Sequence, residues 1–247
     1  MTRKYLLEIS VDGIEKAAAA ERGGADRIEL CADLSVGGLT PSRELLRSVR
    51  NRVHIPIYSM VRPRAGDFVY SDAEFAEMAR SIAVATECGM DGVVLGALKK
   101  SRCIDMARTR KLVDLVRPLP VTFHRAFDEV PDFARALEAV IQTGAARILT
   151  SAGAKTALQG AAKLAELVAA ARDRVSGVGS PRQPDRIIIV PGAGITASTI
   201  AQVVQKTGAA EFHAGLGSVL PYPTLDFATF EAEVRRLAVA LKGHEDA

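Results

Sequence analysis

Four stretches share one pattern: Gly24-Ala-Asp-Arg-Ile-Glu-Leu30, Gly89-Met-Asp-Gly-Val-Val-Leu95, Gly144-Ala-Ala-Arg-Ile-Leu-Thr150 and Gly208-Ala-Ala-Glu-Phe-His213. In each stretch a glycine and small residues lead into a short apolar segment. Glycine adopts the left-handed conformation past a helix end at little cost, so each glycine is expected to end a helix that a strand follows. The glycines are separated by about twice the roughly 30 residues that one strand–helix unit needs. Each interval therefore has room for one further strand.

Short apolar segments lie in those intervals, at 5–9, 55–61, 120–124 and 186–190. Helical patterns separate all the strands, and they cover 13–22, 42–50, 73–86, 104–116, 132–143, 158–174, 197–206 and 227–241. Ser71, with Glu74 three residues later, predicts a capping box, and Thr196 and Asp226 are predicted caps. Short apolar strands bounded by helices are typical of a parallel sheet buried on both faces.

Eight such units in 247 residues have the size of a closed (β/α)8 barrel, so the sequence predicts an α/β fold with a single domain over 1–247. The alternative is an open doubly wound sheet, which is expected to carry a Gly-rich fingerprint after its first strand. Ser10-Val-Asp-Gly13 stands there instead. We expect 176–184, rich in Gly, Ser and Pro, to be a mobile loop and 243–247 to be a polar tail.

Composition excludes several classes of protein. The chain has 32 Lys and Arg against 29 Asp and Glu, a formal net charge of +3 that is spread along the sequence rather than gathered in one basic patch. No apolar run reaches the roughly 20 residues that a membrane-spanning helix needs, and Glu8 and Asp12 interrupt the first apolar stretch where a signal peptide is continuous. Three widely spaced cysteines fit free thiols in a reducing compartment. We therefore expect a cytoplasmic protein with no nucleic-acid and no membrane partner.

Charged and polar side chains lie on or just after strands that closure of the barrel would make neighbours. They are Glu8 on the first strand, Arg27, Glu29 and Cys31 at and after the second, and Glu211 and His213 on the eighth. Like charges this close cannot all stay ionised without a compensating cation. Two interpretations stay open. Arg27, alone or with a second arginine, neutralises the carboxylates in a structural network, or they form a site for a cation or polar substrate in which one carboxylate has a raised pKa and acts as acid or base.

Polar residues also follow the other strands, at the end of the barrel where active sites lie. Three arginines there, Arg62, Arg64 and Arg125, suit a carboxylate or phosphate ligand, and we expect at least one to bind an anion. The alternative is that Asp67 and Asp128 pair with them to hold the loops. This end of the barrel, its mouth, is also expected to include Thr150, Ser151, Gly192, Gly194, Gly215 and Gly217.

Two histidines and one cysteine complete the candidate site. His124 and His213 end strands, and each is interpreted as a general base, a metal ligand or a hydrogen-bonding group. Cys31 is expected to reach the mouth, whereas Cys88 is expected to pack against a helix and Cys103 to be exposed in a loop.

Several motifs occur in a characteristic order between Leu6 and His213. They are Glu29-Leu-Cys31, Gly37-Gly-Leu-Thr-Pro41, Arg62-Pro-Arg-Ala-Gly-Asp-Phe-Val-Tyr-Ser71, Pro120-Val-Thr-Phe-His-Arg-Ala-Phe-Asp128 and Glu211-Phe-His213. With these motifs the chain resembles the CutC family. The resemblance implies a (β/α)8 TIM barrel in the cytoplasm, a part in copper homeostasis, and copper binding in which Cys31 is implicated.

Three positions depart from the pattern of that family. Thr150-Ser-Ala152 stands where relatives tend to have Thr-Ser-Gly, and Pro191-Gly-Ala-Gly194 where they often have Pro-Gly-Gly-Gly. Ala214-Gly-Leu-Gly217 replaces Ser-Ala-Arg or Ser-Gly-Arg, which removes a hydroxyl and an arginine from the mouth. An anion site that uses those two groups is expected to be weaker here.

Two hypotheses of different classes follow. In the first, Cys31, with Met60 or a cysteine of a second subunit in a homo-oligomer, holds Cu(I), which prefers thiolate and thioether ligands. No Cys-x-x-Cys pair or Met-rich run supports it. In the second, the barrel is an enzyme acting on a small anionic metabolite, with Glu29 or His124 transferring protons and the arginines holding the anion. A regulatory or assembly role is a third interpretation, and whether the chain is an enzyme stays open.

Overall fold

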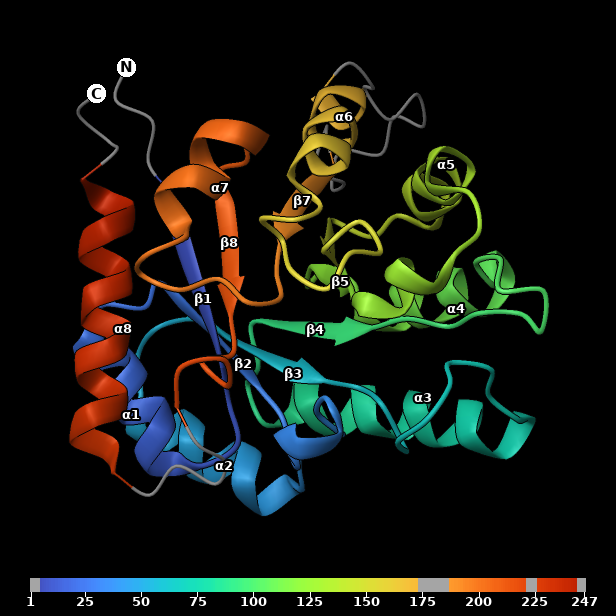
Figure 1. The fold of residues 1–247 in the computed structure, drawn as a ribbon. Coiled ribbons are helices and arrows are strands. Elements are labelled where there is room, and N and C mark those ends of the chain that lie inside the picture. The colour runs from blue at the N-terminus through green and yellow to red at the C-terminus, as the bar shows by residue number, and fades with distance from the viewer. Residues whose placement is uncertain (1–4, 173–186, 221–225, 244–247) are drawn as a thin grey trace.

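Eight parallel strands form one sheet that curls into a nearly closed barrel (Figure 1). The computed structural model describes residues 5–172, 187–220 and 226–243. The strands are β1 (Leu6–Val11), β2 (Arg27–Leu30), β3 (Ile57–Met60), β4 (Gly92–Leu95), β5 (Val121–Phe123), β6 (Arg147–Thr150), β7 (Ile188–Pro191) and β8 (Glu211–Ala214). They are ordered β7-β6-β5-β4-β3-β2-β1-β8, and β7 and β8 lie in contact at the two ends of that order. The predicted (β/α)8 barrel is confirmed.

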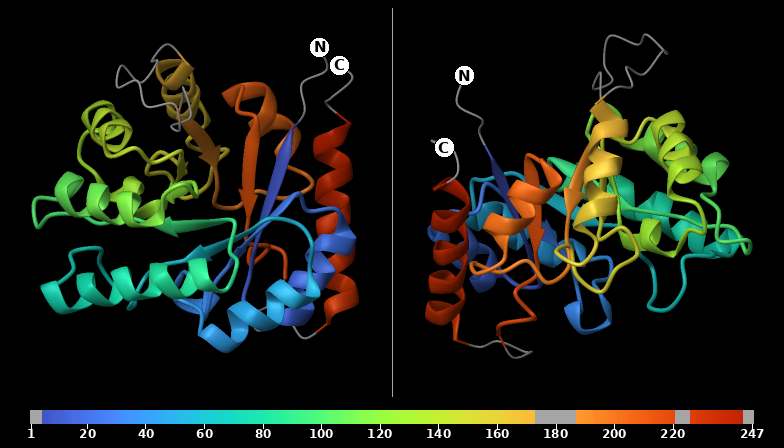
Figure 2. Two further views of the ribbon diagram at one scale, coloured as in Figure 1. Left: turned by 180° about the vertical axis from the view of Figure 1, so that it is seen from behind. Right: turned by 45° about the horizontal axis from the view of Figure 1, so that its top comes forward.

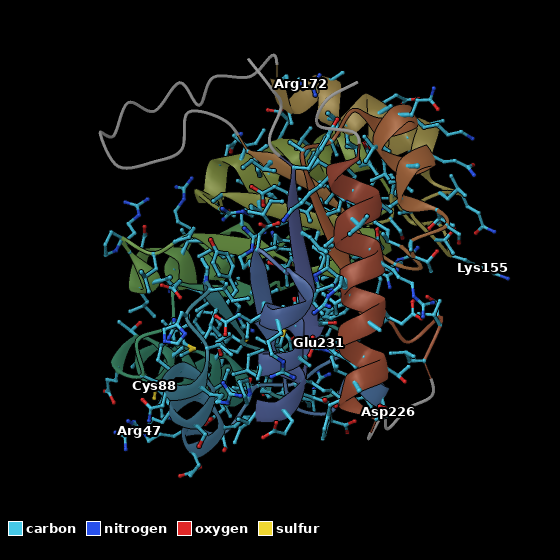
Figure 3. All side chains as sticks on the ribbon, turned by 90° about the vertical axis from the view of Figure 1, so that its left-hand side faces the viewer. Arg47, Cys88, Lys155, Arg172, Asp226 and Glu231 are labelled. Atoms are coloured by element: carbon cyan, nitrogen blue, oxygen red, sulfur yellow. The ribbon has the colours of Figure 1, made fainter. Side chains whose placement is uncertain are left out.

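Helices follow the strands and cover the outside of the barrel (Figure 2). They are α1 (Ile14–Gly23), α2 (Arg43–Arg52), α3 (Asp72–Glu87), α4 (Met106–Val116), α5 (Phe133–Thr143), α6 (Ala161–Arg172), α7 (Ile200–Thr207) and α8 (Phe227–Lys242), with short 3-10 helices η1 (Leu34–Val36) and η2 (Arg125–Glu129). The last helix packs along the first, and Arg22 of α1 binds Glu231 of α8 at 2.7 Å (Figure 3). No helix among the described residues is both long enough and apolar enough to cross a membrane.

The helix ends explain the repeat in the sequence. Gly24, Gly89, Gly144 and Gly208 have φ angles of 95°, 74°, 84° and 65°, so each occupies the left-handed conformation that glycine adopts at little cost. Each of them lies between a helix and the strand that follows it.

Two of the three predicted helix caps are confirmed. Ser71 and Glu74 form a reciprocal capping box at α3, and Asp226 accepts a hydrogen bond from the Thr229 amide at the start of α8. The prediction for Thr196 is wrong, because the cap position of α7 is Thr199. The Thr196 carbonyl already accepts from the Thr199 amide, so the chain makes an extra turn before the helix begins.

Strand pairing brings together the charged residues that the sequence predicted to converge. Glu8 of β1 lies opposite Arg27 of β2 and opposite His213 of β8, and Ser10 lies opposite Glu29. All these side chains are buried inside the barrel, while the apolar core packs between the strands and the helices. The predicted loop at 176–184 lies outside the described residues, and of the predicted tail only Gly243 lies within them, where it ends α8.

Candidate functional site

A cavity of about 850 Å³ lies at the carboxyl ends of the strands, where barrel active sites occur. Its walls come from β1, β2, β3, β6 and β8 and from the loops that follow β2, β3, β5, β7 and β8. Predicted site residues in its lining are Glu29, Arg62, His124, Arg125, Gly194 and His213. The predicted residues outside the lining are Glu8, Cys31, Arg64, Asp67, Ser151, Gly192 and Glu211.

Glu8 and Glu211 belong to a structural ion network beneath the cavity. Arg27 donates from Nε to Glu8 and from Nη2 to Glu211 Oε2 at 2.7 Å, and Arg147 Nε donates to the same Glu211 oxygen at 3.0 Å. Burial by itself raises the pKa of Glu8, but the charges of Arg27 and His213 outweigh it and lower that pKa to about 2. For these two carboxylates the structural interpretation fits, and Arg147 is the second arginine of the network.

Glu29 is not neutralised in the same way. Its Oε1 is buried with no hydrogen-bond partner, and its Oε2 lies 3.8 Å from His213 Nε2. The other ring nitrogen of His213 lies 2.8 Å from Glu8 Oε1. Burial raises the pKa of Glu29. Burial lowers the pKa of His213, but the charges of Glu29 and Glu8 outweigh it and leave that pKa raised. A carboxylate and an imidazole, both with raised pKa, therefore lie close together in the lining of the cavity.

Arg62 is a buried cation whose hydrogen bonds go to neutral groups. It is 6% exposed, and its guanidinium donates to the carbonyl oxygens of Val36, Gly38 and Gly66. Its Nε is buried without a partner, and among the described residues no carboxylate lies within salt-bridge distance of it. A buried charge without a countercharge is unfavourable, so this wall of the cavity favours an anion.

His124 presents a second unpartnered donor. Its Nδ1 accepts a hydrogen bond from the Ala126 amide at 3.2 Å, so the ring hydrogen is on Nε2, which is buried with no partner. Burial, together with the charge of Arg62, lowers the pKa of His124 to about 3, which keeps the ring neutral. Phe68 packs 4.8 Å from the ring, and a Cβ at Gly96 would come within 2.6 Å of Nδ1, so glycine there lets the ring lie against β4.

The remaining predicted arginines hold loops. Arg64 binds Glu74 at 2.5 Å and Asp67 at 2.9 Å, at the edge of α3 and away from the cavity lining. Arg125 lines the cavity but pairs with Asp128 at 2.8 Å. Asp128 also accepts from the amide and hydroxyl of Ser151, which ties the loop after β5 to the loop after β6.

Cys31 lies behind the cavity wall rather than at its surface. It is fully buried in a small cluster with Tyr58, Met60 and Val94, and its Sγ lies 3.6 Å from Glu29 Oε2. Burial, with the nearby charge of Glu29, raises the pKa of the thiol well above its usual range. The side chain is therefore held as a protonated thiol. Cys88 is buried near the end of α3, as predicted (Figure 3), and Cys103 is exposed, as predicted.

Comparisons with known proteins identify relatives over most of the chain. The sequence profile of the CutC family matches residues 5–218. A human protein described as a copper homeostasis protein cutC homolog is 44% identical over 209 residues, which are 85% of this chain and 72% of that protein. A family protein CutC of Xylella fastidiosa (strain 9a5c) is 44% identical over 214 residues, 87% of this chain and 76% of that protein.

This chain belongs to the CutC family. The crystal structure of a putative copper homeostasis protein CutC from Streptococcus agalactiae matches it with a TM-score of 0.77 at 29% identity, covering 85% of this chain and 98% of that one. Phosphoribosyl anthranilate isomerase of Thermotoga maritima shares the fold alone, with a TM-score of 0.61 at 13% identity, over 97% of this chain and 99% of that one.

At two positions that depart from the CutC pattern, the backbone lies in the left-handed region. Ala152 and Ala193, which stand where the family pattern has glycine, have φ angles of 56° and 77°. A side chain in this left-handed region costs about 1–2 kcal/mol, so both alanines are strained. Leu216, in the segment that lacks the family's arginine, has a φ of 53° and lines the cavity with an apolar side chain. Among the three predicted arginines, Arg62 and Arg125 line the cavity, and Arg125 pairs with Asp128.

Phe68 in the cavity lining and Arg147 in the ion network beneath it were not predicted as site residues from the sequence. Phe68 packs 5.1 Å from the Arg62 guanidinium as well as against His124, and it lies in the quoted motif, where its type gave no reason to choose it. Arg147 occupies the same place in the repeat as Arg27, and that correspondence could have identified it.

Proposed function

We propose that this CutC protein binds a small anionic metabolite in the cavity, with Arg62 and His124 holding the anion and Glu29 with His213 moving a proton. The observation that carries the proposal is the Arg62 guanidinium, which is buried, donates to carbonyl oxygens, pairs with no carboxylate among the described residues and keeps Nε unpartnered. A carboxylate or phosphate at this wall would supply the missing countercharge and accept from Nε.

The second half of the proposal rests on the pair of Glu29 and His213. A carboxylate with a raised pKa is protonated and deprotonated more readily near neutral pH than an ordinary one, and that is the property of a general acid or base. His213 supplies or withdraws the compensating proton, because its Nε2 lies 3.8 Å from Glu29.

Ligand binding tests the first half. Inorganic phosphate and malonate are titrated against the wild-type chain, Arg62→Lys and Arg64→Lys, and thermal stabilisation is recorded. A ligand at 100 times its Kd stabilises the folded state by about 2.7 kcal/mol. We expect stabilisation of the wild type and of Arg64→Lys, whose arginine lies outside the lining, and its loss in Arg62→Lys. Equal stabilisation of all three proteins would contradict the proposal.

Copper binding at Cys31 is the second candidate function. The favouring observation is that Cys31 and Met60, two soft donors, lie in one buried cluster beside Glu29. Glu8, Glu29 and His213 also present ligand atoms within 4.8 Å of one another. We rank copper second because the thiol must first lose its proton in a fully buried position, and because Arg27 and His213 already occupy the oxygens of Glu8.

Metal analysis under reducing conditions tests that candidate. Copper bound per chain is measured in the wild type, in Cys31→Ser and in Cys103→Ser, the last being the control at an exposed cysteine. Copper lost in Cys31→Ser alone would support the candidate, and copper unchanged in Cys31→Ser would remove it. A cytoplasmic location and a homo-oligomeric state stay predictions, to be tested by cell fractionation and by light scattering.

A further inference from the structure

Three residues that line the cavity each carry a buried polar atom without a hydrogen-bond partner. Two of these atoms are donors, Arg62 Nε after β3 and His124 Nε2 after β5, and one is an acceptor, Glu29 Oε1 on β2. β3 and β4 separate β2 from β5 in the sheet, and the cavity that the three residues line extends between Glu29 and His124. A buried polar atom without a partner in the protein is available to a water molecule or a ligand.

The protonation state of His124 limits which reactions the cavity is suited to catalyse. A protonated imidazole would serve as a proton donor, but His124 stays neutral, because burial and the charge of Arg62 lower its pKa to about 3. A neutral imidazole N–H together with a guanidinium N–H stabilises an oxygen that gains negative charge without transferring a proton to it. Glu29, a carboxylate of raised pKa that lines the same cavity, is suited to remove a proton from carbon.

We propose, on the basis of the proposed function, that the site catalyses enolisation, which is the reversible removal of a proton from the carbon next to the carbonyl of a small anionic carbonyl compound. Glu29 is the base, and His124 and Arg62 donate hydrogen bonds to the carbonyl oxygen.

The step balances without a co-reactant. The C–H bond breaks and its proton forms an O–H bond with Glu29 Oε1. The electron pair of the broken C–H bond forms the carbon–carbon double bond of the enolate, and the carbonyl π electrons move to the oxygen. There Arg62 Nε and His124 Nε2 donate hydrogen bonds to the oxyanion. Return of the proton from Glu29, to the same carbon or to its neighbour, completes an exchange or an isomerisation.

The lysine in the cavity lining disfavours a Schiff-base mechanism. Lys16 is the lysine among the described residues lining the cavity, and its Nζ lies 2.7 Å from Asp12 Oδ1. An ammonium group bound to a carboxylate is not free to attack a carbonyl carbon. Carbonyl activation through hydrogen bonds therefore fits this cavity better than covalent activation.

Binding of an enolate mimic tests the inference separately from the proposed function. Oxalate is planar and reproduces the two adjacent oxygens of an enediolate, whereas malonate has the same charge without that geometry. We expect calorimetry to give at least tenfold tighter binding of oxalate, and His124→Ala to abolish the preference. Equal affinity for the two would overturn enolisation and leave the anion site standing. Failure of both to bind would refute the proposed function as well.

Deuterium exchange tests the reaction itself. The wild-type chain is incubated in D₂O with pyruvate, 2-oxoglutarate, dihydroxyacetone phosphate and ribulose 5-phosphate, and incorporation beside the carbonyl is followed by NMR. We expect protein-dependent exchange in at least one compound. Glu29→Gln should lower the rate by a factor of about 10² or more while still binding oxalate. An exchange rate equal in the wild type and in Glu29→Gln, or no exchange in any of the four compounds, would overturn the inference.

Discussion

Replacement of Arg27 by methionine is expected to destabilise the barrel strongly. The guanidinium is 3% exposed and binds Glu8 and Glu211, whose side chains are 1% and 11% exposed. Methionine keeps much of the volume but leaves Glu8 with His213 alone and Glu211 with Arg147 alone. Removing one partner of a buried ion pair costs about 3–5 kcal/mol, because the remaining charge stays buried without compensation. For a chain of this size, that corresponds to a fall in Tm of roughly 6–20 °C.

The loss should depend on pH in a defined direction. Glu8 has a folded-state pKa of about 2 against an ordinary value of 4.5, so its stabilisation is full above pH 4.5 and disappears as the pH falls toward 2. That lowering corresponds to about 3 kcal/mol, most of which needs Arg27. The difference between the wild type and Arg27→Met should therefore be largest near neutral pH and shrink below pH 4.5.

Urea denaturation followed by circular dichroism measures both effects, because the chain has no tryptophan for a fluorescence assay. The control is Arg80→Met, which removes a pair with Glu77 on the surface of α3 and is expected to cost less than about 1 kcal/mol. If Arg27→Met does not fold, Glu8→Gln reports on the same pair. A loss no greater than that of Arg80→Met, or one independent of pH, would refute the reasoning.

Three further predictions concern other parts of the molecule. Ala193→Gly relieves left-handed strain (φ 77°), so the free energy of unfolding should rise by up to about 1 kcal/mol, and a fall would show that the strain is absent. His213 has a raised pKa, so its stabilisation is full below pH 6.5 and is lost as the pH rises through the folded-state value; His213→Gln should remove this decline, and an identical profile in the variant would contradict it. A thiol reagent should label Cys103 rapidly in the native protein and Cys31 and Cys88 only on unfolding; rapid labelling of a second thiol would contradict their burial.

The fold was predictable because its determinants are local. The glycine repeat marks the start of every second strand, and the left-handed φ angle of each of its glycines is a property of a few consecutive residues. The error at Thr196 is also local: two residues that can cap a helix stand three apart, and the hydrogen bond between the Thr199 amide and the Thr196 carbonyl decides which begins α7.

The site was predictable in its location and only in part in its chemistry. Closure of the barrel implied that Glu8, Glu29 and Glu211 converge, and strand register confirms it. Which carboxylate stays without a cation depends on Arg147, whose sequence position is remote from all three and which reaches Glu211 through the interior. Which carboxylate pairs with an arginine depends on side-chain geometry, and the hydrophobic periodicity of the sequence does not determine it.

The arginines illustrate the same limit. Arg62 and Arg64 are two residues apart and read alike in the sequence. Arg64 meets Asp67 and Glu74, whereas Arg62 turns inward to carbonyl oxygens and keeps Nε unpartnered. Cys31 was expected at the mouth, and a position just after β2 is consistent with that, but the packing of Gly38 and Met60 covers its sulfur.

The most direct test follows the two unpartnered N–H groups themselves. In ¹H–¹⁵N spectra recorded during an oxalate titration, the signals of Arg62 Nε–H and His124 Nε2–H should move together and saturate at one Kd, while that of Arg64 Nε–H stays in place. Binding of oxalate, measured as heat, with both of the first two signals unmoved would contradict the claim that these donors form the anion site.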